Sequence, residues 1–269
     1  MGIETLSPVA ERFARAAHTY ATHAVVQRQM AACLVDAASP YVTGGGRWFE
    51  FGCGTGMLTR EWLTRWRPEE WVANDLVASH EPCLAHLAAQ GGIGRFRFAG
   101  GDAGAMALPQ GCQVVWSGAA LQWFADVPAM LDKVAAALVP GGVFAFSTFG
   151  PDNYCEIRAL TGSGLTYHTA GAWQAMADAR YEVLVMRQWH EVRYFADPVA
   201  VLRHIKATGV GGVTRTVWCK QQLSRFCRGY EQYETPQGFP LTYHPLVCVW
   251  RAKGYDGMDI QRKDAETFR

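Results

Sequence analysis

The chain has 269 residues, enough for one large α/β domain with an insertion and short for two independent cores. Hydrophobic residues make up 49% of it, which supports a buried core and argues against a disordered chain. The formal net charge of +1 gives no overall attraction to nucleic acid or to an anionic membrane, so a charged partner would have to meet a local patch.

The eight cysteines are scattered, with no CxxC pair and no Cys/His spacing typical of a zinc site. We therefore expect free thiols in a reducing compartment and no metal. The first twenty residues lack a basic stretch followed by an apolar core, and no run of about eighteen apolar residues occurs. A cytoplasmic protein that contacts neither nucleic acid nor membrane is expected.

The segment 8–38 predicts one or two amphipathic helices, because Phe13, Ala17 and Tyr20 recur at helical spacing. Strands and helices alternate after the glycine run 44–46. Strands are expected at Arg47–Phe51, Glu70–Asp75, Arg95–Ala99, Cys112–Ser117 and Val143–Thr148, and helices at Met57–Trp66, Ser79–Ala89 and Val127–Leu138. This alternation implies right-handed crossovers and a mostly parallel sheet with helices on both faces, which binds ligands at the carboxyl ends of its strands.

The pattern loosens after Gly150. We expect a long strand at Glu182–Phe195, a helix capped by Asp197 and ending near Thr208, a helix at Lys220–Tyr233 and a final strand at Tyr243–Ala252. The polar, aperiodic segment 254–269 predicts a frayed tail.

A glycine-rich loop, Glu50-Phe51-Gly52-Cys53-Gly54-Thr55-Gly56, separates the first strand from the first helix of the alternation. Glycines at every second position let the backbone approach a bulky ligand and adopt positive φ. The spacing is GxGxG, whereas dinucleotide oxidoreductases use GxGxxG to bind a pyrophosphate. A tight turn without a ligand is the plainer alternative. Cys53 is interpreted as a packing residue, because no histidine accompanies it in the sequence.

Two aspartates end the next two strands. Asp75 comes about twenty residues after the glycine loop, where a carboxylate can accept both hydroxyls of a ribose. Asp102 follows the third strand, where it could meet an adenine amino group with Ala103 alongside. Either aspartate alone could be a helix cap. Three such features in order on successive strand ends favour a nucleoside-containing ligand.

The sequence resembles the class I methyltransferases, and more narrowly the malonyl-acyl-carrier-protein O-methyltransferases of biotin synthesis. The glycine loop is shared by many methyltransferases, whereas other segments are more particular to the narrower family. The resemblance rests on RFARAAHTYATHAVVQRQMA (12–31), FEFGCGTGMLTREW (49–62), NDLV (74–77), SGAALQWFAD (117–126), PGGVFAFSTFGPDN (140–153), LRHIKATGVGG (202–212) and PLTYH (240–244).

The resemblance implies a Rossmann-like fold with a mostly parallel seven-stranded sheet and an insertion before the last strand. It implies an N-terminal helical lid at 1–42, a methyltransferase domain at 43–253 with a substrate- and carrier-binding insertion at about 150–240, and a flexible tail at 254–269. S-adenosylmethionine is the cofactor it implies. The contacts it suggests for this cofactor are Glu50, Gly52, Gly54, Gly56, Asp75, Leu76, Asp102, Ala103, Ser117 and Gln122.

The substrate implied is the free carboxylate of malonyl-acyl carrier protein, or of malonyl-CoA. A carboxylate is already deprotonated at neutral pH, so no general base is required and positioning should dominate. Tyr20, Lys206 and His244 are expected to position it. The alternatives are a place for Tyr20 in the apolar stripe of its helix and a purely structural role for His244.

Between Arg158 and Arg228 there are ten basic and four acidic residues, which fits an acidic carrier protein, although solvated basic faces are common. Three other functions stay open. They are methylation of another small carboxylate or nucleophile, a nucleotide-sugar or NAD-dependent enzyme, and binding of S-adenosylmethionine without catalysis. The oligomeric state cannot be derived from the sequence.

Overall fold

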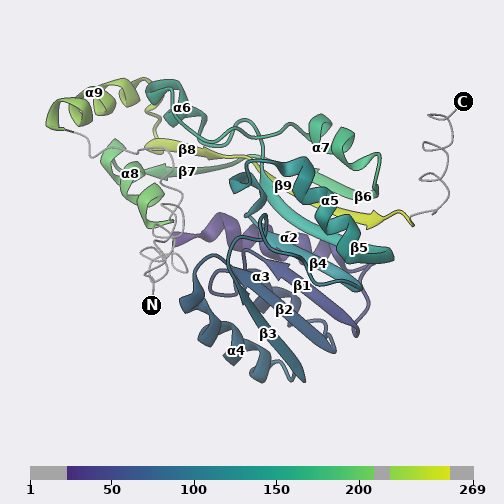
Figure 1. Cartoon of the computed structure of the whole chain (residues 1–269). Helices are drawn as coiled ribbons and strands as arrows, with labels where there is room; N and C mark the ends of the chain where they lie inside the picture. The colour runs from purple at the N-terminus through teal and green to yellow at the C-terminus, as the bar shows by residue number, and fades with distance from the viewer. Residues whose placement is uncertain (1–22, 209–218, 255–269) are drawn as a thin grey trace, which may run out of the picture.

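A seven-stranded sheet forms the centre of the molecule, of which this computed structural model describes residues 23–208 and 219–254 (Figure 1). The strand order is β3-β2-β1-β4-β5-β9-β6. Strands β1 to β5 pair in parallel, and β9 runs antiparallel to both β5 and β6. The strands are β1 (Arg47–Phe51), β2 (Glu70–Asp75), β3 (Arg95–Gly100), β4 (Cys112–Gly118), β5 (Leu138–Phe149), β6 (Tyr181–Gln188) and β9 (Pro245–Ala252). The predicted mostly parallel seven-stranded Rossmann-like sheet is confirmed.

Helices cover both faces of this sheet. Neighbouring residues of a strand point to opposite sides, so each strand contributes side chains to the packing on both faces. Trp48 lies in a buried cluster that includes side chains of α2 (Val25–Ala38), α3 (Met57–Trp62) and α4 (Glu81–Gln90). Phe49 lies in a second cluster, which includes α5 (Val127–Ala137) and α7 (Ala170–Ala177). The three layers bury both faces of the strands, which explains their continuous apolar runs.

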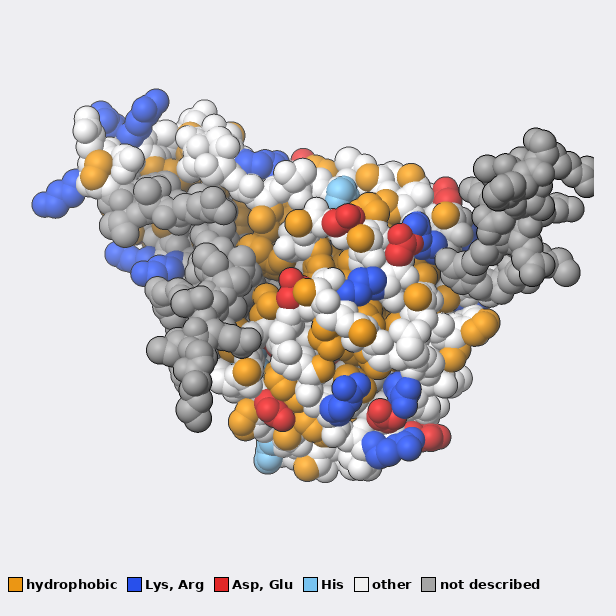
Figure 2. Space-filling view, in the orientation of Figure 1, with side chains coloured by type: hydrophobic (Ala, Val, Ile, Leu, Met, Phe, Trp, Pro, Cys, Tyr) orange, Lys and Arg blue, Asp and Glu red, His pale blue; other side chains and the backbone are white. Residues whose placement is uncertain are grey.

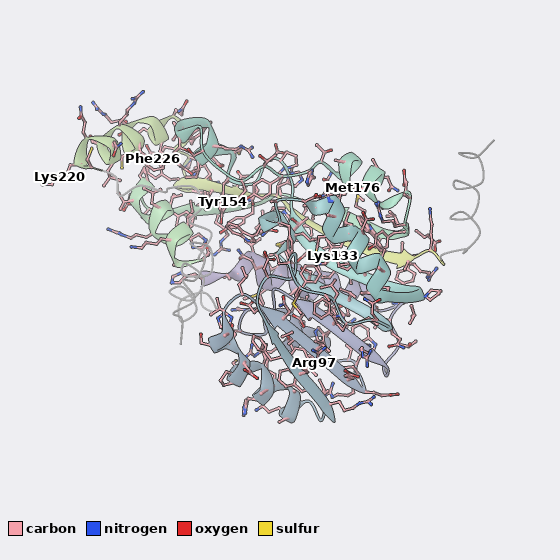
Figure 3. All side chains as sticks on the ribbon, in the orientation of Figure 1. Arg97, Lys133, Tyr154, Met176, Lys220 and Phe226 are labelled. Atoms are coloured by element: carbon pink, nitrogen blue, oxygen red, sulfur yellow. The ribbon has the colours of Figure 1, made fainter. Side chains whose placement is uncertain are left out.

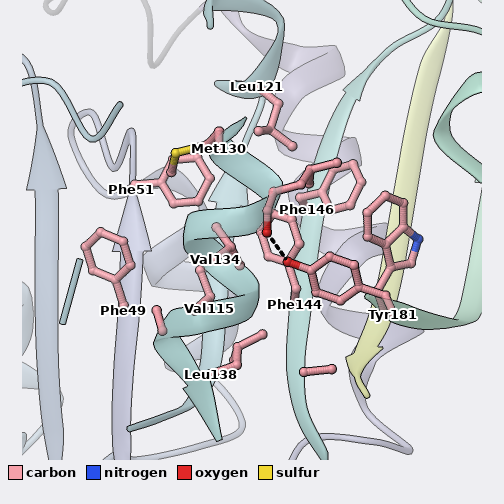
Figure 4. Packing of buried hydrophobic residues seen from close by; sticks show 14 of the residues in the cluster. Phe49, Phe51, Val115, Leu121, Met130, Val134, Leu138, Phe144, Phe146 and Tyr181 are labelled. Carbon is pink, nitrogen blue, oxygen red and sulfur yellow. Dashed lines mark hydrogen bonds between the residues drawn. The ribbon is translucent and has the colours of Figure 1, made fainter. Parts of the chain in front are cut away.

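Aromatic residues dominate the core beneath α5 (Figure 4). Phe144 and Phe146 of β5 stack with ring centroids 4.7 Å apart, and Trp250 of β9 meets Phe146 edge-on at the same separation. The buried hydroxyl of Tyr181 donates a 2.6 Å hydrogen bond to the carbonyl of Leu131 in α5, as the dashed line in Figure 4 shows. This bond satisfies a polar atom inside an apolar layer and ties β6 to α5.

A second, smaller unit follows the carboxyl end of β5 (Figure 1). We call it the cap, and it consists of α6 (Cys155–Thr161), β7 (Glu191–Phe195), α8 (Pro198–Ala207), α9 (Lys220–Tyr230) and β8 (Phe239–Tyr243). Strands β7 and β8 form an antiparallel sheet of their own. The cap has its own apolar cluster, to which Val26 and Met30 of α2 also belong. The insertion expected at about 150–240 therefore contributes most of the cap and also β6 of the main sheet.

The prediction of a single strand at Glu182–Phe195 is wrong, whereas the final strand expected at Tyr243–Ala252 is β9, which begins two residues later, at Pro245. The segment Glu182–Phe195 forms β6 and β7, which belong to two different sheets, and the partner of β7 is β8, a strand that was not predicted. The end of β6 and the start of β9 lie side by side, because the N–H of Trp189 donates a hydrogen bond to the carbonyl of Pro245. Hydrophobic alternation continues through the break between β6 and β7, so it does not reveal it.

Other differences concern short or terminal elements. Helices α6 and α7 are not predicted, and the helix that begins at Met57 ends at Trp62 instead of Trp66. Asp197 caps α8 as expected, because its Oδ1 accepts the N–H of Ala200 at 2.7 Å.

Of the expected lid and tail, residues 1–22 and 255–269 lie outside the described residues. No helix among the described residues has the length and apolarity needed to cross a membrane.

Candidate active site

A cavity of about 550 Å³ lies at the carboxyl ends of the parallel strands. Four consecutive strand ends line it, through residues after β1, β2, β3 and β4, and Gln27 and Ala31 of α2 complete the wall. It lies where the strand order reverses between β1 and β4, the position at which open α/β sheets bind ligands. Its volume is in the range of small-molecule sites.

The three glycines of the loop after β1 all have positive φ, of 67° at Gly52, 52° at Gly54 and 82° at Gly56. A Cβ at Gly52 would lie 2.5 Å from that of Ala120, and a Cβ at Gly56 would lie 2.3 Å from Leu87. A Cβ at Gly54 would meet no atom within 4 Å. Gly52 and Gly54 line the cavity, whereas Gly56 does not and instead lets α3 pack against α4.

Asp75 connects the ends of β1 and β2 and is only 8% exposed. Its Oδ2 accepts the N–H of Gly54 at 2.7 Å, and its Oδ1 accepts the N–H of Val77 at 2.8 Å. His80 Nδ1 lies 3.2 Å from the same Oδ1. Oδ2, which accepts only the N–H of Gly54, retains a lone pair for a ligand hydroxyl. Leu76, which is 37% exposed, offers an apolar surface next to this carboxylate on the cavity wall.

The loop after β3 is held in place by a lysine from α5 (Figure 3). Asp102 and Ala103 line the cavity, and Oδ1 of Asp102 accepts the N–H of Gly104 at 2.7 Å. The Lys133 ammonium donates to the carbonyls of Ala103, Gly104 and Met106 at 2.9, 2.6 and 2.7 Å. All three ammonium protons are thereby used, and the loop is fixed in one conformation.

Glu50 is a buried carboxyl group on the cavity wall. Burial raises its pKa from an ordinary 4.5 to about 7. Hydrogen bonds from Trp62 Nε1 at 2.8 Å and Thr59 Oγ1 at 2.9 Å to Oε2 oppose this shift. A carboxyl group whose pKa is near neutrality becomes negatively charged easily when a cation binds beside it. Glu50 therefore suits a site for a cationic ligand. In the same loop, burial raises the pKa of the Cys53 thiol well above its ordinary value, which agrees with a packing role.

Ser117 and Gln122 lie behind the cavity wall, which Gly118, Ala119 and Ala120 form here. Ser117 is fully buried within β4. The Gln122 amide donates to the carbonyl of Ala119 at 2.6 Å and accepts the hydroxyl of Thr148 at 3.1 Å. This pair of bonds supports the wall at Ala119, which has the strained φ of 51°. Contact of either residue with the cofactor stays a prediction.

Of the three residues expected to position the substrate carboxylate, the two that the structure describes do not line the cavity. Tyr20 lies outside the described residues. Lys206 is exposed on α8, and His244 is buried between β8 and β9, and neither lines the cavity. His244 Nδ1 accepts the N–H of Asp152 at 3.2 Å, and its ring lies 4.4 Å from that of His190. The roles of Tyr20, Lys206 and His244 stay predictions.

Sequence reasoning missed several residues of the cavity. Asn74 donates to the carbonyls of Ala99 and Gly101, which joins the ends of β2 and β3. His80 and Lys133 support the two aspartate loops. Trp123 is not among the missed residues, because its position after the fourth strand favours a place on the wall; it lines the cavity and packs against the apolar cluster of the cap. Asn74 and His80 flank Asp75 closely in the sequence and could have been found there. Lys133 occupies an ordinary position of an amphipathic helix, so no pattern singles it out.

Comparison with known proteins agrees with this geometry. Residues 49–142 match the family described as a methyltransferase domain. The chain is 40% identical to the malonyl-[acyl-carrier protein] O-methyltransferase of Prosthecochloris aestuarii over 90% of the chain and 92% of that protein. It is 36% identical to the protein of the same name from Chlorobium luteolum, over 94% of the chain and 97% of the relative.

The chain belongs to the malonyl-[acyl-carrier protein] O-methyltransferase family. Solved structures support the fold alone. The YcgJ protein from Bacillus subtilis matches with a TM-score of 0.58 and 16% identity, over 84% of this chain and 98% of that one. A methyltransferase structure from Bacillus halodurans matches with a TM-score of 0.59 and 13% identity, over 81% and 97%.

As a member of this family the chain is a methyltransferase, with S-adenosylmethionine as its methyl donor. The cavity residues fit this cofactor. Gly54 leaves room for a ligand against the main chain, and four acidic residues, Glu50, Asp75, Asp102 and Asp126, line a wall suited to a sulfonium cation. Lys133 is the only lysine or arginine among the described lining residues, and backbone carbonyls occupy it. A dinucleotide pyrophosphate would therefore find no free cation on this wall.

Proposed function

We propose that the enzyme methylates the free carboxylate of a malonyl thioester carried on acyl carrier protein, and that the resulting methyl ester primes pimeloyl synthesis for biotin. The similarity to malonyl-[acyl-carrier protein] O-methyltransferases over 90% of the chain carries this proposal. Malonyl-CoA shares the reacting group and is the second substrate to test. We also propose that residues 43–253 form the catalytic domain and that the cap, with the N-terminal residues, receives the malonyl group.

The chemistry requires positioning more than acid or base catalysis. S-adenosylmethionine supplies a methyl group on a sulfonium cation. Backbone atoms around Gly52 and Gly54 lie against its amino-acid end in our proposal, the Asp75 carboxylate accepts its ribose hydroxyls, and the Asp102 loop meets its adenine. Malonate is ionised at neutral pH, so no protein group has to remove a proton. The apolar wall of Ala119, Ala120 and Trp123 excludes water from the attacking oxygen.

Substrate assays test the proposal directly. Purified protein is incubated with methyl-labelled S-adenosylmethionine and with malonyl-, succinyl- or acetyl-acyl carrier protein, and the products are identified by mass. Label transfer to the malonyl carrier, with the mass of a methyl ester, is expected. Preference for succinyl carrier would assign a different acid, and no transfer to any carrier would contradict the proposal. The Asp75→Asn variant, assayed at a cofactor concentration near the Kd of the native protein, serves as the control, because its cofactor binding is expected to be weaker.

A further inference from the structure

Helices α8 and α9 carry five cationic side chains and no carboxylate. Together they span 21 residues, 10 in α8 and 11 in α9. The five are exposed and are Arg203, Lys206, Lys220, Arg225 and Arg228. None of them forms an ion pair or a side-chain hydrogen bond that the structure shows with another described residue. Figure 2 shows Lys and Arg side chains around this end of the molecule, with no Asp or Glu among them on the visible face.

The fold places these charges on the solvent-facing sides of two helices that pack together. Phe226 and Tyr230 of α9 pack with Val201 and Ile205 of α8 in the apolar cluster of the cap, so the two helices lie against each other. Their apolar sides are thereby buried and their charged residues face solvent. Figure 3 shows Lys220 at the outer end of α9, with Phe226 nearer the middle of the helix.

Three exposed carboxylates, Asp197, Glu231 and Glu234, border these helices, fewer than the five cations that the helices carry. Asp197, just before α8, accepts the N–H of Ala200 and caps the helix. Glu156 of α6 is buried and accepts the N–H of Thr242 at 3.1 Å. Glu231 and Glu234 follow α9 and are exposed acids at its end. Cations that lie close together without enough carboxylates create a positive potential. An acidic partner is attracted by this potential, so the two surfaces are complementary in charge.

We infer that the exposed face of α8 and α9 docks the acidic carrier protein that delivers the malonyl thioester. This inference rests on the proposed function. The cap follows the carboxyl end of β5, and Trp123 links its apolar cluster to the cavity, so a partner on this face lies on the cavity side of the sheet. The flexible prosthetic group of the carrier would span the remaining distance from this face to the cavity.

The test compares a carrier-bound substrate with one that has no carrier. The variant Lys220→Glu/Arg225→Glu reverses two charges of the face and leaves the cavity residues untouched. Its KM for malonyl-acyl carrier protein is expected to rise roughly tenfold, because rim charges control association. Its KM for malonyl-N-acetylcysteamine and its Kd for S-adenosylmethionine should equal those of the native protein. Raising the salt concentration should increase the carrier KM of the native enzyme more than that of the variant.

A matched control reverses two exposed arginines elsewhere, Arg97→Glu on β3 and Arg187→Glu on β6. It should leave all three constants unchanged, and Arg97 is visible far from α9 in Figure 3. Direct binding of holo-acyl carrier protein to the native protein and to both double variants is measured as well. Equal binding by all three, or no binding by the native protein, would overturn the docking site even if methylation succeeds. Failure to methylate any malonyl thioester, with binding lost only in the Lys220/Arg225 variant, would instead reject the proposed reaction and keep the docking site.

Discussion

The backbone N–H of Gly54 donates a 2.7 Å hydrogen bond to Oδ2 of Asp75, which joins the loop after β1 to the end of β2. Two features that lie twenty-one residues apart in the sequence are therefore parts of one hydrogen-bonded unit. A change at either residue should alter the position of the other. The predictions for this site follow from that coupling.

Asp75→Asn is expected to weaken S-adenosylmethionine binding by about 10- to 100-fold, because hydrogen bonds to a charged group contribute roughly 1.5–3 kcal/mol. An amide has one acceptor oxygen, so the N–H of either Gly54 or Val77 also loses its partner. Asp75→Ala leaves both without a partner and should lower the melting temperature further. Titration calorimetry and thermal denaturation measure both effects. Asp36→Asn, at an exposed ion pair, is the control. Native affinity in Asp75→Asn would contradict the assignment.

Gly54→Ala should abolish cofactor binding while the protein remains folded. Its Cβ would point into open cavity space, so the obstacle concerns the ligand and not the fold. The left-handed backbone adds a destabilisation of about 1 kcal/mol. Gly92→Ala is a matched control, because Gly92 has φ 69°, has equally free space for a Cβ and lies outside the cavity. Similar melting temperatures with cofactor binding lost only in Gly54→Ala are expected. Equal binding by both variants would show that the ligand does not approach Gly54.

Lys133→Met should raise the Kd for S-adenosylmethionine roughly tenfold, because the loop of Asp102 and Ala103 loses three hydrogen bonds to its carbonyls. The effect should appear in the KM for the cofactor and leave kcat at saturation nearly unchanged. Lys253→Met removes a comparable bond, to the carbonyl of Asp178, far from the cavity. The control should bind normally. A fall in kcat alone would show that Lys133 does not act through cofactor binding.

The stability of the cofactor-free enzyme should fall as pH rises from 4.5 to about 7, through the contribution of Glu50. Its pKa is about 7 in the folded protein and 4.5 in the unfolded chain. In that window the folded state retains a proton that the unfolded state has released, so rising pH favours unfolding. Glu50→Gln stays neutral and keeps an acceptor for Trp62 and Thr59. Urea denaturation across the window should show the variant gaining stability relative to the native enzyme, whereas parallel curves would contradict the assignment.

The sequence allows accurate prediction of the first two strands. Arg47–Phe51 and Glu70–Asp75 have the expected bounds, because each is an apolar run buried on both faces and ended by a turn or a functional polar residue. The aspartates and two of the three glycines also lie on the cavity wall as expected. Local sequence patterns predict a structural feature well when a single strand or loop determines it.

The features that the sequence did not predict depend on contacts between residues that lie far apart in the chain. The break at Trp189 and His190 exists because β6 pairs with β9 while β7 pairs with β8, and alternation is the same on both sides of it. Lys133 acts on a loop almost thirty residues away, and Ser117 is hidden because it still belongs to β4. Such roles depend on how elements pack, and local composition does not encode them.

The contact between Gly52 and Ala120 limits how this protein can vary. Because the methyl group of Ala120 fills the space beside Gly52, a side chain at position 52 would require a glycine at position 120, and a larger residue at position 120 could not be compensated at Gly52, which has no side chain to shorten. Compensation at position 120 would still leave a side chain at φ 67°, which few residue types accept. The two sites should therefore drift very little through evolution.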